Sequence, residues 1–195
     1  VLDFGGVLIE LAGIETMLEW CPHVDGTDDL WRRWLHSPAV RAYESGRATT
    51  AEFGEAVVAE FGLPVPAGDF LALFERWPRR LFPGTHELLG EIGARYRLAS
   101  ASNTNEMHWK LFSSEFSLPE RFHHNFPSYR VGKLKPDADY FVHILEQVNA
   151  KPSRVVFVDD NAINVEAARH CGLSAHLARG ASGLRSTLVA LGLLA

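Results

Sequence analysis

Hydrophobic and polar positions change their spacing along the chain, and the first stretch is the most distinctive. An apolar run from Val1 to Leu8 contains a single acid, Asp3, and is interrupted by the pair Gly5-Gly6. A run of this kind predicts a buried β-strand that ends in a sharp turn, because glycine permits tight turns and close approach of a ligand. Ligands of open α/β sheets bind beyond the carboxyl ends of the strands. Asp3 is therefore a candidate reactive group, although Asp and Gly are also common in ordinary turns.

The spacing from Gly13 to about Trp77 is helical throughout. Apolar residues recur three and four positions apart, notably over 30–35, 53–61 and 70–74. The sequence Thr49-Thr50-Ala51-Glu52 is a capping box that predicts a helix start, and residues 62–66 predict a stop and a restart. We therefore expect an insertion of about four helices without strands.

Helix and strand signals alternate from Pro83-Gly84 onward. Strands are predicted over 98–102 and 155–158, and helices over 85–96, 105–116, 137–149 and 161–171. Strands that alternate with helices of this length indicate a parallel sheet covered on both faces. The predicted architecture is a doubly wound, Rossmann-like α/β core made of residues 1–12 and 80–195. Residues 13–79, called here the helical insertion, interrupt that core.

Composition narrows the class of function. The chain has 195 residues, of which 47% are hydrophobic, so it can bury a sizeable core. Its formal net charge is -5. Its basic residues are dispersed, which argues against a nucleic acid or an anionic membrane as partner. Cys21 and Cys171 lie far apart in no metal-ligand spacing, and this favours a reducing compartment. A cytoplasmic location is the expectation.

Polar clusters follow the predicted strands. Ser102-Asn103 closes one strand, Asp159-Asp160-Asn161 closes another, and 133–137 supplies two lysines before a helix. Together with Asp3 these residues would meet at one edge of the sheet. Phosphoryl transfer needs donors and cations for the equatorial oxygens and a nucleophile in line with the leaving oxygen. Adjacent carboxylates repel one another unless a cation lies among them, and oxygen ligands suit Mg²⁺.

These residues resemble the motifs of the haloacid dehalogenase (HAD) superfamily, in the subfamily with a helical cap after the first strand. Asp3-Phe4-Gly5-Gly6-Val7 resembles the nucleophile loop, Ser102-Asn103 the phosphate-binding motif, Lys135-Pro136 the motif lysine, and Asp159-Asp160-Asn161 with Asn164 the acidic metal loop. The run Ser102-Asn103-Thr104-Asn105 and the run Asp159-Asp160-Asn161-Ala162-x-Asn164 also resemble a bacterial branch of sugar phosphatases that includes glucose-1-phosphate phosphatases.

The resemblance implies a Mg²⁺-dependent phosphomonoester hydrolase that works through an aspartyl-phosphate. Its implied substrate is a small phosphorylated metabolite, with sugar phosphates as one candidate, and the protein would be a monomer or homodimer. The implied roles are nucleophile for Asp3, metal ligands for Asp3, the Gly5 carbonyl and Asp160, and positioning of the metal or the lysine for Asp159. Ser102 and Lys135 would bind the phosphoryl group, and substrate contacts are implied for Gly6, Asn103 and, from the insertion, Arg47.

One position departs from the family pattern. Most phosphatases of the family carry a second aspartate two residues after the nucleophile as general acid, and here that position is Gly5. General acid–base help contributes roughly 10²–10⁴-fold, so another donor would be needed for poor leaving groups. His108 is a candidate donor, and the alternative is a partly buried helix residue without a catalytic role.

Other residues also allow two interpretations. Lys133 competes with Lys135 for the motif role, and Arg47 is either a specificity residue or a solvated turn arginine. Trp31, Trp34 and Trp77 are expected in the core of the insertion, because they recur with other apolar residues at helical spacing.

Two other classes of function remain open. A metal-independent dehalogenase would use Asp3 to attack carbon, but it gives no reason to gather carboxylates beside an anionic nucleophile. A non-catalytic phosphate-binding member of the fold is consistent with Gly5. The junctions of the insertion, near 10–13 and 77–83, are expected to act as two hinges that let it close over the site.

Overall fold

The computed structural model describes residues 1–195 and contains the parallel sheet that the sequence predicts. Strand β3 (Ala99–Ser102) pairs with β4 (His124–Pro127), and β5 (Val156–Asp159) pairs with β6 (Ser174–Leu177), both in parallel register. Leu2 bridges Ser100 on one side and Val158 on the other, so the chain start joins the two pairs. The resulting order is β4, β3, residues 1–3, β5, β6.

The predicted first strand is much shorter than the apolar run. Its extended part ends at Asp3, because the chain then turns back and both Leu8 and Ile9 donate their amides to the Phe4 carbonyl. Gly6 adopts a φ of +66° within this turn, a conformation that glycine adopts at little cost. The Phe4 ring stacks on Trp109 beneath the sheet, with centroids 5.7 Å apart. The apolar residues after Asp3 therefore pack in the core as a turn.

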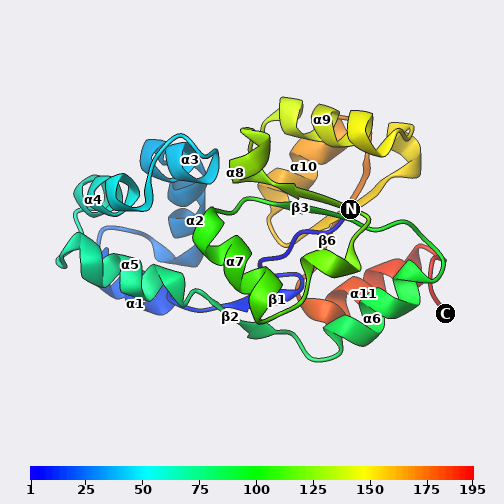
Figure 1. Ribbon diagram of the computed structural model, residues 1–195, viewed down its shortest axis with the longest axis horizontal. Coiled ribbons are helices and arrows are strands. Elements are labelled where there is room, and N and C mark those ends of the chain that lie inside the picture. The colour runs from blue at the N-terminus through cyan, green and yellow to red at the C-terminus, as the bar shows by residue number, and fades with distance from the viewer.

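Helices cover both faces of the sheet (Figure 1). Helices α9 (Ala138–Val148) and α10 (Ala162–His170) lie on one face, and α6 (Thr85–Gly93) and α11 (Gly180–Ala190) lie on the other. Strand residues alternate between the two cores: Phe157 packs with α9 and α10, whereas Val158 packs with α6 and α11. The doubly wound architecture is thus confirmed.

The helical insertion contains five helices where the sequence predicts about four. They are α1 (Ile14–Trp20), α2 (Gly26–His36), α3 (Pro38–Glu44), α4 (Thr50–Phe61) and α5 (Ala67–Glu75). The extra boundary lies at Ser37, whose hydroxyl accepts the Val40 amide and caps α3 while Pro38 occupies its first turn. The predicted capping box at Thr49 and Glu52 is formed. The insertion has its own buried cluster, which includes Trp34, Phe53, Phe70, Phe74 and Trp77.

A short antiparallel ribbon lies where the insertion meets the core. Strand β1 (Ile9–Leu11) pairs with β2 (Pro78–Leu81), and neither strand follows from the sequence pattern because the pairing joins residues about 70 positions apart. The domain boundary that we predict after residue 79 falls within β2, and it stays a prediction.

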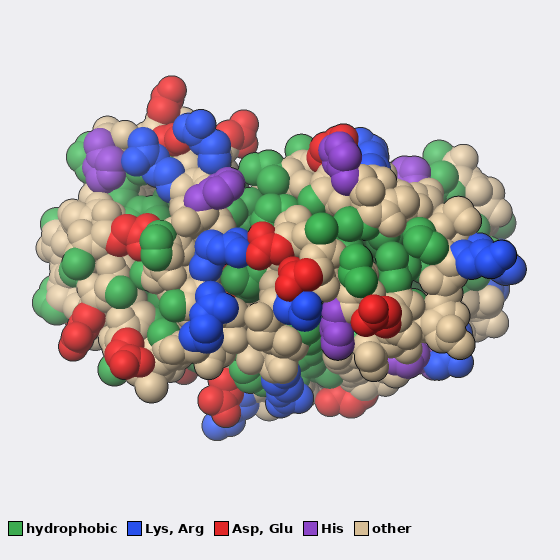
Figure 2. Space-filling view, turned by 90° about the horizontal axis from the view of Figure 1, so that it is seen from above, with side chains coloured by type: hydrophobic (Ala, Val, Ile, Leu, Met, Phe, Trp, Pro, Cys, Tyr) green, Lys and Arg blue, Asp and Glu red, His purple; other side chains and the backbone are tan.

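The remaining elements connect the core helices and strands. Helix α7 (Glu106–Ser114) runs beside the insertion, followed by the short helices η1 (Pro119–Arg121), α8 (Ser128–Val131) and η2 (Pro152–Arg154). None of the helices combines the length and apolar character that crossing a bilayer would require. On the face seen in Figure 2, lysine and arginine side chains stand among acidic ones.

Candidate active site

Lys135 is the centre of the polar cluster at the carboxyl edge of the sheet. Its Nζ lies 2.9 Å from Asp3 Oδ1 and 2.7 Å from Asp159 Oδ2, and its side chain is only 1% exposed. Burial lowers the pKa of Lys135, but the Asp159 and Asp3 carboxylates outweigh that effect and hold it above its ordinary value. The lysine therefore stays charged between two acids that come from different strand ends.

The Asp159 carboxylate is fully used by contacts within the protein. Its Oδ2 accepts from Lys135 Nζ and from Asn164 Nδ2 (3.2 Å). Its Oδ1 accepts from the Asn161 amide at 2.8 Å and from Asn164 Nδ2 at 3.1 Å. Asp159 is completely buried. Its surroundings suit a residue that holds Lys135 in place.

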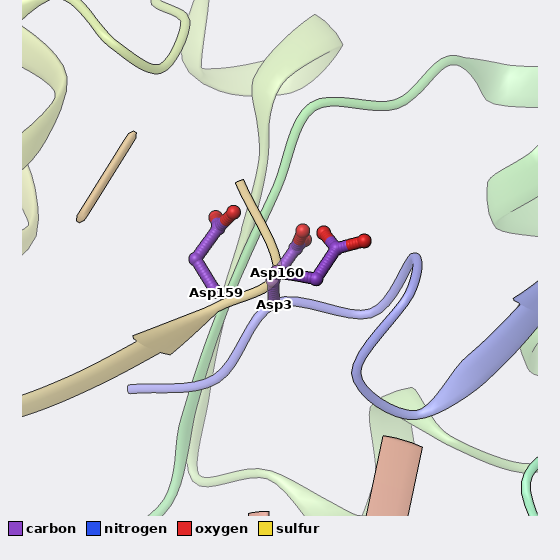
Figure 3. A group of neighbouring side chains, drawn as sticks. All are labelled: Asp3, Asp159 and Asp160. Atoms are coloured by element: carbon purple, nitrogen blue, oxygen red, sulfur yellow. The ribbon is translucent and has the colours of Figure 1, made fainter. Parts of the chain in front are cut away.

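Asp3 and Asp160 complete an acidic cluster with Asp159. One carboxylate oxygen from each residue lies within 4.8 Å of the others, and all three carboxylates point to the same side of the strand ends (Figure 3). Burial raises the pKa of Asp3, an effect that Lys135 opposes and the two neighbouring carboxylates increase. Loss of hydration and the charge of Asp159 raise the pKa of Asp160 to about 6. Three acids around one lysine thus leave an excess of negative charge.

The backbone around Lys135 is fixed by Asn103. The Asn103 side chain accepts the Lys135 amide through Oδ1 and donates Nδ2 to the Lys135 carbonyl, both at 2.9 Å. Lys133, the other predicted candidate, points to the surface and pairs with Asp139. The structure therefore brings Lys135, and not Lys133, to Asp3.

A cavity of about 490 Å³ opens above these residues. Its floor is polar and includes Asp3, Gly5, Ser102, Asn103, Thr104, Lys135, Asp160 and Asn164. Ser102 ends β3 and is buried. Thr104 was missed at the sequence level: its Oγ1 is buried without a hydrogen-bond partner, and so is Asn164 Oδ1. The signal that could have indicated Thr104 is its place in the run Ser102-Asn103-Thr104-Asn105, which resembles the phosphatase branch.

The opposite wall of the cavity comes from the helical insertion and is mostly aromatic. It is formed by Trp31, Trp34, Leu35, Phe74 and Trp77, together with the carboxylate residue Glu44. The charged residues Asp28 and Arg32 are exposed at its rim. Trp34 and Trp77 thus belong to the core of the insertion and Trp31 packs against it, as predicted, and all three also line the cavity.

The two glycines after Asp3 have different surroundings. Gly5 lines the cavity, and a Cβ there would meet only the Leu11 side chain, at 3.3 Å. At Gly6 a Cβ would lie 1.8 Å from Asp160 Oδ2, so only glycine lets Asp160 approach this closely. The Gly6 amide already donates to the Ile9 carbonyl. Gly6 therefore accommodates Asp160. We expected Gly6 to contact the substrate, but its amide is already engaged within the protein.

His108 lines the cavity but both of its ring nitrogens are engaged. Nε2 lies 2.7 Å from the Phe74 carbonyl, which can only accept, so Nε2 carries the proton and Nδ1 accepts from Asn105 Nδ2. Burial lowers the pKa of His108 to about 4. A neutral imidazole that donates its single N–H to a carbonyl has no proton for a leaving group. His108 therefore fits the alternative interpretation, a buried helix residue without a catalytic role.

The structure does not bring Arg47 to the cavity. This arginine is exposed and is not among the residues that line the cavity, and the preceding residue, Gly46, lies close to the Tyr129 carbonyl. From the same turn it is Glu44 that reaches the cavity. No periodicity distinguishes Glu44 from other helix-terminal acids, so the sequence does not reveal it.

Curated relatives differ in how much of their length the chain covers. The chain is 26% identical to a sesquiterpene phosphatase of Aspergillus oryzae over 188 residues. This match covers 89% of this chain and 85% of the relative. It spans only 9% of a drimenol cyclase of Aspergillus calidoustus (46% identical over 48 residues) and 12% of bifunctional epoxide hydrolase 2 of Rattus norvegicus (38% over 69 residues).

Solved structures share the fold across most of the chain. A HAD family enzyme of Bacteroides thetaiotaomicron, in complex with magnesium and inorganic phosphate, is 25% identical with a TM-score of 0.71 over 92% of both chains. An L-2-haloacid dehalogenase of Xanthobacter autotrophicus with covalently bound chloropropionic acid is 19% identical, with a TM-score of 0.62 over 100% of this chain and 82% of the other. The model of one family, haloacid dehalogenase-like hydrolase, matches residues 1–172, and this chain therefore belongs to the haloacid dehalogenase-like hydrolases.

Proposed function

We propose that the protein is a Mg²⁺-dependent phosphomonoesterase that forms an aspartyl-phosphate on Asp3. The observation that carries the proposal is the pairing of Asp3 with a buried lysine on the polar floor of a cavity, next to the carboxylate of Asp160. The Bacteroides thetaiotaomicron enzyme with magnesium and phosphate and the phosphatase relative support it.

The residues around Asp3 fit a hard dication. Asp3 and Asp160 offer oxygen ligands and Gly5 lines the same cavity, its carbonyl keeping one lone pair beside the Val7 amide that it accepts, whereas both Asp159 oxygens are occupied by protein donors. When bound, Mg²⁺ would neutralise the negative charge that Lys135 alone leaves unbalanced. We assign Asp3, the Gly5 carbonyl and Asp160 as ligands, and Asp159 as the residue that positions Lys135.

The remaining residues bind the phosphoryl group and form the covalent bond. Lys135 and the Ser102 hydroxyl hold phosphoryl oxygens while an Asp3 carboxylate oxygen attacks phosphorus and the bond to the leaving oxygen breaks. Water then attacks phosphorus in the second half-reaction, which releases phosphate and restores Asp3. The unpartnered Thr104 hydroxyl, on the same floor, is a further donor for phosphate.

The aromatic wall supports an apolar leaving group. A sugar would leave most of its hydroxyls without partners against Trp31, Trp34, Phe74 and Trp77, and unpaired polar groups are costly. A phosphate of an apolar alcohol would bury its hydrocarbon there. We therefore prefer this class to the sugar phosphates that the resemblance implies, in line with the sesquiterpene phosphatase relative.

Dehalogenation is the second candidate, because a dehalogenase shares the fold. The acidic cluster disfavours it, since metal-free attack on carbon gains nothing from Asp160 beside an anionic nucleophile.

The test is an assay of the purified chain against phosphomonoesters and 2-haloacids, with Mg²⁺ and with EDTA. We expect phosphate release only with Mg²⁺, a phosphorylated protein detectable after acid quench, and kcat/KM at least roughly tenfold higher for an isoprenoid alcohol monophosphate than for glucose 1-phosphate, since burying even a few methylene groups contributes that much. Asp3→Asn should lose both turnover and the phosphoprotein. Retention of turnover by Asp3→Asn, or halide release without Mg²⁺, would show that the proposal is wrong.

A further inference from the structure

We propose that Glu44, from the helical insertion, is the acid that protonates the leaving oxygen in place of the carboxylate missing at Gly5. This inference rests on the proposed phosphatase function and adds the catalytic residue that the core lacks. A phosphate of an apolar alcohol leaves as an alkoxide, which is a poor leaving group and needs a proton donor. The donor has to face the cavity from the side opposite Asp3.

Glu44 occupies that position. It is the last residue of α3, it is 8% exposed, and it lines the same cavity as Asp3 and Lys135. It makes no ion pair, although a buried carboxylate ordinarily requires one. A buried acid without a counter-ion, on the aromatic wall where the leaving group would lie, is placed to exchange a proton with a ligand.

Contacts between the insertion and the core hold this end of α3 over the site. Arg41, one turn before Glu44, pairs with Asp137, which follows the Lys135-Pro136 dipeptide. Gly46 touches the Tyr129 carbonyl of α8, and α3 and α8 lie side by side (Figure 1). Glu44 is thus docked between two contacts to the core segment that carries Lys135.

The surroundings of Glu44 keep a large fraction of it protonated near neutral pH. Burial raises its pKa to about 7, while the Trp34 indole and the charges of Lys135 and Arg41 oppose the rise. The other ionisable residues of the cavity are less suited to donate. His108 is neutral with its N–H engaged, Asp28 and Arg32 are exposed at the rim, and Asp3 and Asp160 belong to the acidic cluster.

The proton balance closes over the two half-reactions. As Asp3 attacks phosphorus and the bond to the leaving oxygen breaks, the Glu44 carboxyl gives its proton to that oxygen, and the alcohol leaves. The Glu44 carboxylate then takes a proton from the water that attacks the aspartyl-phosphate, so inorganic phosphate is released and Glu44 is protonated again. Nothing beyond substrate and water is consumed.

The test compares Glu44→Gln with the wild type on an alkyl phosphate and on 4-nitrophenyl phosphate, whose leaving group needs little protonation. We expect kcat/KM for the alkyl ester to fall by about 10²–10⁴-fold, and that for the nitrophenyl ester by less than about tenfold. Turnover of the nitrophenyl ester also shows that the variant is folded. Glu55→Gln, an exposed acid on α4, is the matched control and should affect neither ester.

Two further measurements separate catalysis from structure. The wild-type kcat/KM for the alkyl ester should decline as the pH rises through about 7, and Glu44→Gln should lack this decline. Adding Gly5→Asp to Glu44→Gln should restore at least tenfold of the alkyl activity, because a side chain at Gly5 displaces only Leu11. Equal losses on both esters, or a pH profile that Glu44→Gln does not alter, would overturn the role of Glu44 while leaving the phosphatase proposal intact. If the wild type hydrolyses neither ester with Mg²⁺, both proposals fail.

Discussion

Replacing Asp159 by Asn should destabilise the protein strongly without abolishing its response to Mg²⁺. All four contacts of this carboxylate come from donors: Lys135 Nζ, the Asn161 amide, and Asn164 Nδ2 twice. An amide in its place must turn its NH₂ group toward one of those donors. Since Asp159 is completely buried and pairs with a buried lysine, the substitution breaks a desolvated ion pair as well.

The size of the effect follows from these contacts. Removing one partner of a buried ion pair costs about 3–5 kcal/mol when the remaining charge has no other partner. Because Lys135 keeps its contact with Asp3, we expect the lower end of this range. For a domain of this size each kcal/mol corresponds to about 2–4 °C in Tm, so Asp159→Asn should lower Tm by roughly 6–12 °C. Asp160→Asn is the matched control, because Asp160 makes no ion pair and its raised pKa shows that its charge is unfavourable where it lies. Its Tm without Mg²⁺ should equal or exceed that of the wild type.

The assay is thermal unfolding at pH 7 with and without saturating Mg²⁺. A ligand at 100 times its Kd stabilises by about 2.7 kcal/mol, which should raise the wild-type Tm by roughly 5–11 °C. Asp159→Asn should keep most of this rise, and Asp160→Asn should lose it. If instead Asp159→Asn loses the rise and Asp160→Asn keeps it, then Asp159 is the metal ligand and the argument from its occupied oxygens is wrong.

Two further predictions concern residues that the structure removes from the chemistry. His108 binds a proton less readily when folded, with a pKa of about 4 against an ordinary 6.5, so the unfolded state takes up more protons in this interval and stability should rise with pH from about 4 to 6.5. His108→Gln should flatten that slope in Tm measured at pH 4.5 and 7, whereas His36→Gln, at an exposed position, should not; an unchanged slope in His108→Gln would contradict the burial argument. Arg47→Ala should change KM less than about twofold for any phosphate ester, as expected of an exposed turn residue; a large and substrate-selective rise would show that the turn reaches the site during turnover.

The sequence was informative wherever a local pattern and the geometry of a parallel sheet were enough. Asp3, Ser102 and Asp159 each lie at the carboxyl end of an extended segment, and the carboxyl ends of parallel strands share one edge, so their convergence could be predicted from order alone. The choice of Lys135 over Lys133 also agrees with the structure, but for a different reason. The Asn103 side-chain amide holds the Lys135 backbone by two hydrogen bonds, whereas the following helix begins only at Ala138 and not at Pro136.

The features that escaped prediction depend on contacts between distant segments. Strand β2 exists only because β1 lies beside it, and its polar sequence, Pro78-Arg79-Arg80-Leu81, has no strand signal of its own. Glu44 and Arg47 lie only three residues apart, yet Glu44 lines the cavity and Arg47 does not, and Gly46 between them lies close to the Tyr129 carbonyl of the core. Local periodicity contains no information about how the insertion docks on the core.

The ribbon formed by β1 and β2 changes how the insertion could move. Its two connections pair as antiparallel strands, with Ile9 opposite Leu81 and Glu10 opposite Arg80 before the register shifts at Leu11, and the Glu10–Arg80 ion pair crosses between them. The two junctions that we expected to act as separate hinges are therefore joined by this pairing. Any opening of the insertion would have to twist or bend the double-stranded ribbon and separate Arg41 from Asp137. Because both groups of that ion pair are partly exposed, added salt would weaken it, and such an opening would depend on ionic strength.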